Sequence, residues 1–148
     1  MQNKTKIAGK HTFAYITQKT IDVGDTEGHI IVLSEYEGFN VSTGKNKFMD
    51  GALDVGMGFY DLVNGNGTSQ GYGNFSLNGD VIFWKHNGKI ATTLSPEGKP
   101  VTTFEGSWTY TKGTGKYENS QGSGTFKGKL ISRTIFVIDW EGEYFIKK

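Results

Sequence analysis

The chain has 148 residues, the size of one domain, and its 16 basic and 15 acidic residues leave a formal net charge of +1. It contains no cysteine, which excludes disulfide frameworks, thiol catalysis and thiolate metal sites. The charges are scattered and no basic run exceeds two residues, so we expect no nucleic-acid partner. No stretch approaches the roughly 18 apolar residues of a membrane span.

Glycine is frequent, with 22 residues, proline is rare, with 2, and aromatic residues make up 14% of the chain. Frequent glycine beside many aromatic residues is typical of tight turns and close-packed strands, not of disorder. The N-terminal segment 1–6 is polar and has no apolar signal-peptide region. We therefore expect a cytoplasmic protein, or a periplasmic or secreted one whose signal peptide has been removed.

Apolar and polar residues alternate along the chain, and no window has a sustained helical period. Asn-Gly pairs at 78–79 and 87–88 and the Gly-Asn-Gly sequence at 65–67 are typical of hairpin turns. The alternation predicts strands at 12–17, 29–37, 51–62, 68–77, 80–86, 89–94, 101–111, 121–132 and 134–145. Eight or nine strands with short connections predict one all-β domain over residues 1–148, either an up-and-down antiparallel barrel or a sandwich.

The distribution of side chains favours a barrel. Segment 101–111 places Phe104, Trp108 and Tyr110 on one face, and segment 121–132 carries glycines on its apolar face. Eight such strands close around an interior that is filled with side chains or holds one small ligand. Inward glycines favour a cavity, and the alternative is that they only permit strand coiling at the barrel corners.

Three segments carry a resemblance: Phe104 to Tyr110, then Gly113 to Tyr117, then Gly122 to Phe126. A strand, a Gly-x-Gly-aromatic turn and a Gly-x-Gly strand in this order resemble the C-terminal signature of the allene oxide cyclase barrel group. That group includes plant allene oxide cyclases, dirigent proteins and small bacterial barrel proteins. Lys112 stands where the group has the first glycine of a pair, and the resemblance covers roughly residues 101–132.

The resemblance implies a barrel of about eight strands that holds a reactive hydrophobic, oxygenated molecule in an apolar cavity. No segment of the N-terminal half matches the cyclase active-site strands, so no catalytic residue is carried over. A lipocalin-like barrel is the alternative fold. Its Gly-x-Trp motif belongs near the first strand, whereas Gly106-Ser-Trp108 falls late, and no C-terminal helix is predicted here.

The residues themselves suggest candidates for chemistry. Glu35 and Asp61 each share a strand face with apolar residues, where an acid is either a rim residue or a buried group with a raised pKa. Either acid, or the phenol of Tyr60, is a candidate for proton transfer. The aromatic residues Phe104, Trp108, Tyr110, Trp140, Tyr72 and Phe83 are the candidates for contact with a ligand.

We expect neither a metal nor a nucleotide cofactor. The three histidines lie far apart in the sequence without metal-ligand spacing, and Gly113-Thr-Gly115 does not open a helix that would hold a phosphate. Three functions remain open: a cyclase or isomerase, a non-catalytic carrier of an apolar ligand, or an interaction module without a cavity. The resemblance also implies a homodimer or homotrimer, for which Ile135 and Val137 are candidate contacts on the outer wall.

Overall fold

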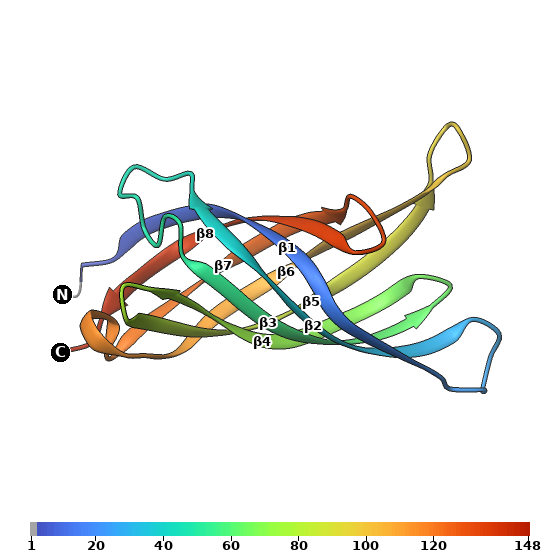
Figure 1. Cartoon of the computed structure of the whole chain (residues 1–148), viewed down its shortest axis with the longest axis horizontal. Coiled ribbons are helices and arrows are strands. Elements are labelled where there is room, and N and C mark those ends of the chain that lie inside the picture. Colours follow the sequence, from blue (N-terminus) through green and yellow to red (C-terminus); the bar gives the residue numbers. More distant parts are fainter. Residues whose placement is uncertain (1–2) are drawn as a thin grey trace.

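The computed structural model describes residues 3–148 and is a closed barrel of eight antiparallel strands (Figure 1). Each strand pairs with the next one in the sequence, and the last strand pairs with the first. In the described part of the chain the only helix is the short 3₁₀ turn η1 (Gly115–Tyr117), and no helix there could cross a membrane. The predicted all-β antiparallel barrel is confirmed. Its strands are β1 (Thr5–Asp22), β2 (His29–Ser42), β3 (Leu53–Val63), β4 (Asn66–Leu77), β5 (Asp80–Leu94), β6 (Pro100–Gly113), β7 (Ser120–Leu130) and β8 (Ile135–Ile146).

The turn predicted at Asn78-Gly79 is confirmed, since both residues have positive φ angles, 54° and 86°. The turn predicted at 65–67 forms one residue earlier, at 64–65. The turn predicted at 87–88 is wrong, because β5 continues through it and Gly88 pairs with Gly106 of β6. A Cβ atom on Gly88 would lie 2.1 Å from the carbonyl oxygen of Glu105. Glycine is needed there for the close approach of two strands.

Aromatic rings from neighbouring strands lie across the inward glycines. A Cβ atom on Gly73 would lie 2.2 Å from the ring of Trp84. The ring of Trp108 would lie 2.5 Å from a Cβ atom on either Gly124 or Gly142. The inward glycines do make room inside the barrel, but rings fill most of that room.

One end of the barrel is closed by the segment 43–52, which joins β2 to β3 and lies at the same end as both termini (Figure 1). Phe48 and Met49 of this segment are buried in the core. The fully buried Asn40 holds it in place, donating from Nδ2 to the Met49 carbonyl at 3.0 Å and accepting from Trp140 Nε1 at 2.9 Å. We call the segment 43–52 the plug.

Candidate functional site

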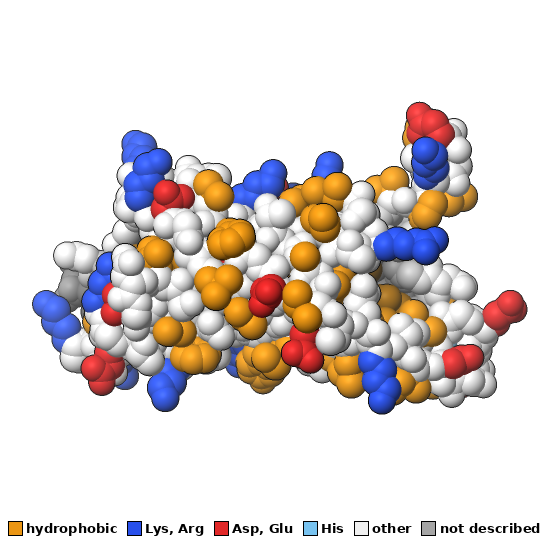
Figure 2. Space-filling view, viewed as in Figure 1, with side chains coloured by type: hydrophobic (Ala, Val, Ile, Leu, Met, Phe, Trp, Pro, Cys, Tyr) orange, Lys and Arg blue, Asp and Glu red, His pale blue; other side chains and the backbone are white. Residues whose placement is uncertain are grey.

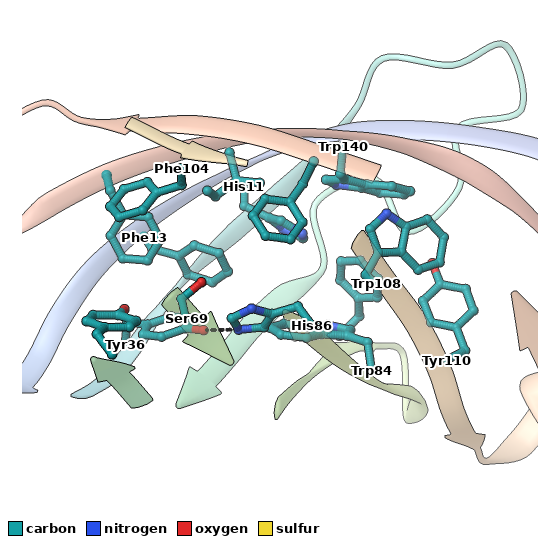
Figure 3. Close-up of a pocket in the computed structure, with 15 residues that line it drawn as sticks. His11, Phe13, Tyr36, Ser69, Trp84, His86, Phe104, Trp108, Tyr110 and Trp140 are labelled. Carbon is teal, nitrogen blue, oxygen red and sulfur yellow. Dashed lines mark hydrogen bonds between the residues drawn. The ribbon is translucent and has the colours of Figure 1, made fainter. Parts of the chain in front are cut away.

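The space left inside the barrel is a cavity of about 70 Å³ with mostly aromatic walls, to which all eight strands contribute (Figure 3). A cavity that binds benzene measures roughly 150 Å³, so in the conformation observed this one is too small for benzene and has room for a few water-sized molecules. Figure 3 shows side chains that converge from opposite walls, with His11 and Trp140 facing Trp84 and His86. Any larger ligand must displace a side chain.

Four of the six aromatic residues predicted to contact a ligand line this cavity: Phe104, Trp108, Tyr110 and Trp140. The indole of Trp108 is fixed by a hydrogen bond from Nε1 to the carbonyl of Thr125 at 3.2 Å. Together with the bond that Trp140 donates to Asn40, this anchors two of the three tryptophans in the wall.

The other two predicted aromatic residues lie outside. Tyr72 is 60% exposed and Phe83 is 37% exposed, on the outer face of the barrel. Successive residues of a strand point to opposite faces. Tyr72 therefore points outward between two inward glycines, and Trp84, one residue after Phe83, takes the inward position. Contact between these two residues and an interior ligand is excluded by this placement.

The two predicted catalytic carboxylates also lie on the outer wall. Glu35 is exposed and accepts a hydrogen bond from the Thr17 hydroxyl at 3.3 Å. Asp61 lies 2.7 Å from Nε2 of His29, whose Nδ1 is 2.5 Å from Asp25. The hydrogen bond to Asp25, followed by the one to Asp61, raises the pKa of His29. Neither Glu35 nor Asp61 reaches a molecule inside the barrel, so the role predicted for them does not fit the structure.

Tyr60, the third residue predicted to be catalytic, does face the cavity. Its hydroxyl lies 3.1 Å from that of Tyr15 and accepts a hydrogen bond from Ser34 Oγ at 3.2 Å. Burial raises the pKa of both tyrosines, so the two phenols remain neutral. These three hydroxyl groups form a polar chain towards the end of the barrel opposite the plug.

The most distinctive feature of the interior, which no sequence pattern indicates, is a buried pair formed by His11 of β1 and Asp54 of β3. Asp54 is fully buried and its Oδ2 contacts Nδ1 of His11, while its Oδ1 has no protein partner. Burial raises the pKa of Asp54, and the charge and hydrogen bond of His11 oppose that shift. The ring of His11 stacks on Trp140, with centroids 5.7 Å apart.

A second histidine, His86, lies on the facing wall. Its Nε2 is 3.1 Å from the Tyr36 hydroxyl, and its Nδ1 has no protein partner (Figure 3). Burial, assisted by the charge of His11, lowers the pKa of His86 to about 4, so its ring is neutral at neutral pH. Trp84 Nε1 and the Tyr110 hydroxyl are likewise buried without a protein partner. Unpaired polar atoms inside a protein cost roughly 1–3 kcal/mol each, and a bound molecule with polar groups removes that cost.

The arrangement is suited to proton transfer. Asp54 orients the imidazole of His11 through Nδ1, which leaves Nε2 as the atom that can take or give a proton. Within residues 3–148, no group of three or more His, Asp and Glu side chains is placed to hold a metal ion.

No family model and no curated protein matches this chain. Among solved structures, a protein of unknown function from Clostridium acetobutylicum ATCC 824 matches with a TM-score of 0.55 and 12% identity, over 97% of each chain. The pterocarpan synthase dirigent protein GePTS1 is similar with a TM-score of 0.49 and 12% identity, over 99% of this chain and 90% of its own. At such identities a likeness concerns the fold alone. The structure confirms the closed eight-stranded antiparallel barrel predicted for this chain, and the likeness to the Clostridium protein extends over nearly the whole of that barrel.

Proposed function

We propose that this protein binds a small hydrophobic molecule with oxygen-containing groups inside its barrel, and that His11 moves a proton of that molecule in an isomerase- or cyclase-type reaction. The observation that carries the proposal is the buried His11–Asp54 pair beside an aromatic cavity whose walls hold unpaired polar atoms. Aromatic walls favour an apolar or planar molecule. The Trp84 indole N–H and the Tyr110 hydroxyl are free to donate hydrogen bonds to its oxygen atoms.

The cavity has to widen to admit such a molecule, and Trp84 is the side chain best placed to move. Trp108 and Trp140 are held by hydrogen bonds from their indole nitrogens, whereas Nε1 of Trp84 has no partner. The Trp84 ring lies with its centroid 6.2 Å from that of His11. A rotation of Trp84 therefore opens space next to the imidazole at the cost of packing contacts alone.

The proposed proton transfer needs no oxidant and no cofactor. The neutral imidazole of His11 keeps its proton on Nδ1, which donates a hydrogen bond to Asp54, so Nε2 carries a lone pair and acts as a base. It takes a proton from the carbon next to a substrate carbonyl, and the electron pair of that C–H bond moves to the carbonyl oxygen. A hydrogen bond from Tyr110, whose pKa burial raises well above its ordinary value, stabilises the enolate. His11 then returns the proton to a different atom, which completes the isomerisation.

Binding is tested by calorimetry with phenol and the larger 2-naphthol on wild type, Trp84→Leu and Phe83→Leu. We expect Trp84→Leu to bind 2-naphthol more tightly than wild type, because it enlarges the cavity beside His11. Phe83→Leu is the matched control, since it changes the neighbouring residue on the outer wall and should bind like wild type. The proposal that ligands bind inside the barrel is wrong if neither probe binds any of the three proteins, or if the two variants change the affinity for 2-naphthol equally.

Catalysis is tested with 1-indanone in D₂O, following deuterium incorporation next to its carbonyl by NMR. Wild type should accelerate the exchange, and His11→Gln should abolish the acceleration while retaining indanone binding. Binding without accelerated exchange in the wild type would favour the alternative function, a non-catalytic carrier. A structural role for the His11–Asp54 pair would support that alternative, since the contact also links β1 to β3 across the intervening β2.

A further inference from the structure

Strands β6 and β7 separate from each other at one end of the barrel. Within residues 3–148 their pairing stops at Thr109 and Ser123, although β6 continues to Gly113 and β7 already begins at Ser120. The end of β6 carries a bulge at Thr111, which is skipped in the register between β5 and β6, and a bulge bends the strand that carries it. The separation leaves a groove between the two strands on the outside of the barrel.

This groove has a volume of about 620 Å³, within the range of roughly 300–1,000 Å³ that small-molecule sites occupy. It lies near both termini (Figure 1), and Figure 2 shows basic and acidic side chains at that end of the barrel. It therefore has room for a small molecule without any displacement of side chains. We call it the β6–β7 groove; besides Thr109–Gly113 and Ser120–Ser123 it is lined by Lys4, Glu118, Asn119, Glu143, Phe145 and Lys147.

Two hydroxyl groups of the β6–β7 groove are buried without a hydrogen-bond partner among the described residues. They are Oγ1 of Thr109 and Oγ of Ser120, a residue that is only 5% exposed. Such groups lose the hydrogen bonds that they would make to water. Each hydroxyl can both donate and accept, and the side-chain amides of Asn119 and Gln121 add further donors and acceptors. The best complement to this lining is a ligand with several hydroxyl groups of its own.

Charges of both signs surround the β6–β7 groove. Lys4 and Glu143 form an ion pair at 3.4 Å, and the rim also carries the exposed side chains of Lys112, Lys147 and Glu118. A ligand with a net charge would meet groups of its own sign there as well as groups of the opposite sign. The mixture of charges therefore favours an uncharged ligand, which uses the lysines as donors and the glutamates as acceptors.

We propose that the β6–β7 groove binds a short, uncharged saccharide. Its hydroxyl groups pair with the unpartnered hydroxyls of Thr109 and Ser120 and with the polar rim. The half-buried ring of Phe145, the register partner of Gln121, offers an apolar surface to the carbon-bound hydrogens of a sugar ring. This proposal is independent of the proposed function, because it uses neither the interior cavity nor the His11–Asp54 pair.

Titration of the ¹⁵N-labelled full chain with cellobiose, maltose and lactose, followed through amide chemical shifts, tests the proposal. We expect at least one of them to shift the amides that line the groove, and Thr109→Val to weaken its binding about fivefold through the loss of one hydrogen bond. Thr103→Val is the matched control, because Thr103 is exposed on the same outward face of β6 but lies outside the groove, and it should bind like wild type. The proposal is overturned if none of the three shifts these amides at about 10 mM, ten times a Kd of roughly 1 mM, or if the two variants have equal effects.

A nitroxide label locates the bound saccharide. The chain contains no cysteine, so a single introduced cysteine takes the label at one position. Gln121→Cys places the label in the β6–β7 groove, and Met57→Cys places it on the exposed face of β3, on the opposite side of the ring of strands. We expect the first label to broaden the proton signals of the saccharide and the second to leave them sharp. Equal broadening by both labels would place the saccharide elsewhere and overturn the proposal.

The charge of the ligand is tested by comparing glucose with glucuronate and glucosamine in the same titration. Glucose should bind more tightly than either charged sugar, because each of these meets side chains of its own sign. Tighter binding of glucuronate would identify an anion site at Lys112 and Lys147, and tighter binding of glucosamine a cation site at Glu118. Either result would overturn the assignment to an uncharged saccharide.

Discussion

The pH dependence of stability is the sharpest test of the interior, and His86 is the group that provides it. Its pKa is about 4 in the folded protein, whereas histidine in an unfolded chain has a pKa near 6.5. Between these two values the unfolded state binds more protons than the folded state. The stability of the fold therefore decreases as the pH falls from about 6.5 towards 4.

The two pKa values determine the size of the effect. Because the unfolded state binds the proton of His86 more tightly, the free energy of unfolding is lower than at neutral pH by about 2 kcal/mol at pH 5 and about 3 kcal/mol at pH 4. For a domain of this length, 2 kcal/mol corresponds to a decrease in Tm of roughly 4–8 °C. The raised pKa of the Asp54 carboxyl acts in the opposite direction, because a buried carboxyl that binds its proton more tightly stabilises the fold as the pH falls.

Urea unfolding followed by tryptophan fluorescence, at several pH values between 7 and 4.5, measures the effect against His86→Gln. The variant has no titrating group at this position, so the difference between the two proteins isolates the contribution of His86. Between pH 7 and pH 5 we expect the free energy of unfolding to fall by about 2 kcal/mol more in the wild type than in the variant. Parallel losses in both proteins would refute the reasoning, because His86 would then not be buried in its neutral form.

Two further predictions concern packing. Gly124→Ala should lower the free energy of unfolding by about 1–3 kcal/mol, because the added methyl group would lie 1.9 Å from the carbonyl oxygen of Glu141 and 2.5 Å from the ring of Trp108. The neighbouring outward substitution Ser123→Ala should change it by less than about 0.5 kcal/mol. Equal effects of the two substitutions in urea unfolding would contradict the close approach of β8 and the Trp108 ring to Gly124. Asn40→Leu should lower the free energy of unfolding by about 2–4 kcal/mol and speed amide hydrogen exchange in the plug, because it removes the hydrogen bonds to the Met49 carbonyl and from the Trp140 indole. Unchanged exchange would show that the plug is held by apolar contacts alone.

Local sequence patterns predicted much of this barrel. Alternation of apolar and polar residues gave the strands, and Asn78-Gly79 gave one hairpin, because side-chain direction and turn geometry depend on residues close in the sequence. In β6 the inward face was identified correctly, since Trp108 and Tyr110 lie on it and polar residues lie on the other face. The same pattern predicted a turn at Asn87-Gly88 that does not form, because an Asn-Gly pair also fits where two strands approach closely.

The tertiary structure decided which face of β3 points inward. The face with Met57 appears more apolar in the sequence, yet it lies outside, and the inward face carries Asp54, two glycines and Tyr60. A small barrel needs glycines inside so that rings from neighbouring strands fit, and its inward face can therefore be the less apolar one. The contact between His11 and Asp54 joins residues 43 positions apart on strands separated by a third. Only closure of the barrel brings these two side chains together, because neither residue carries a local pattern that specifies the other.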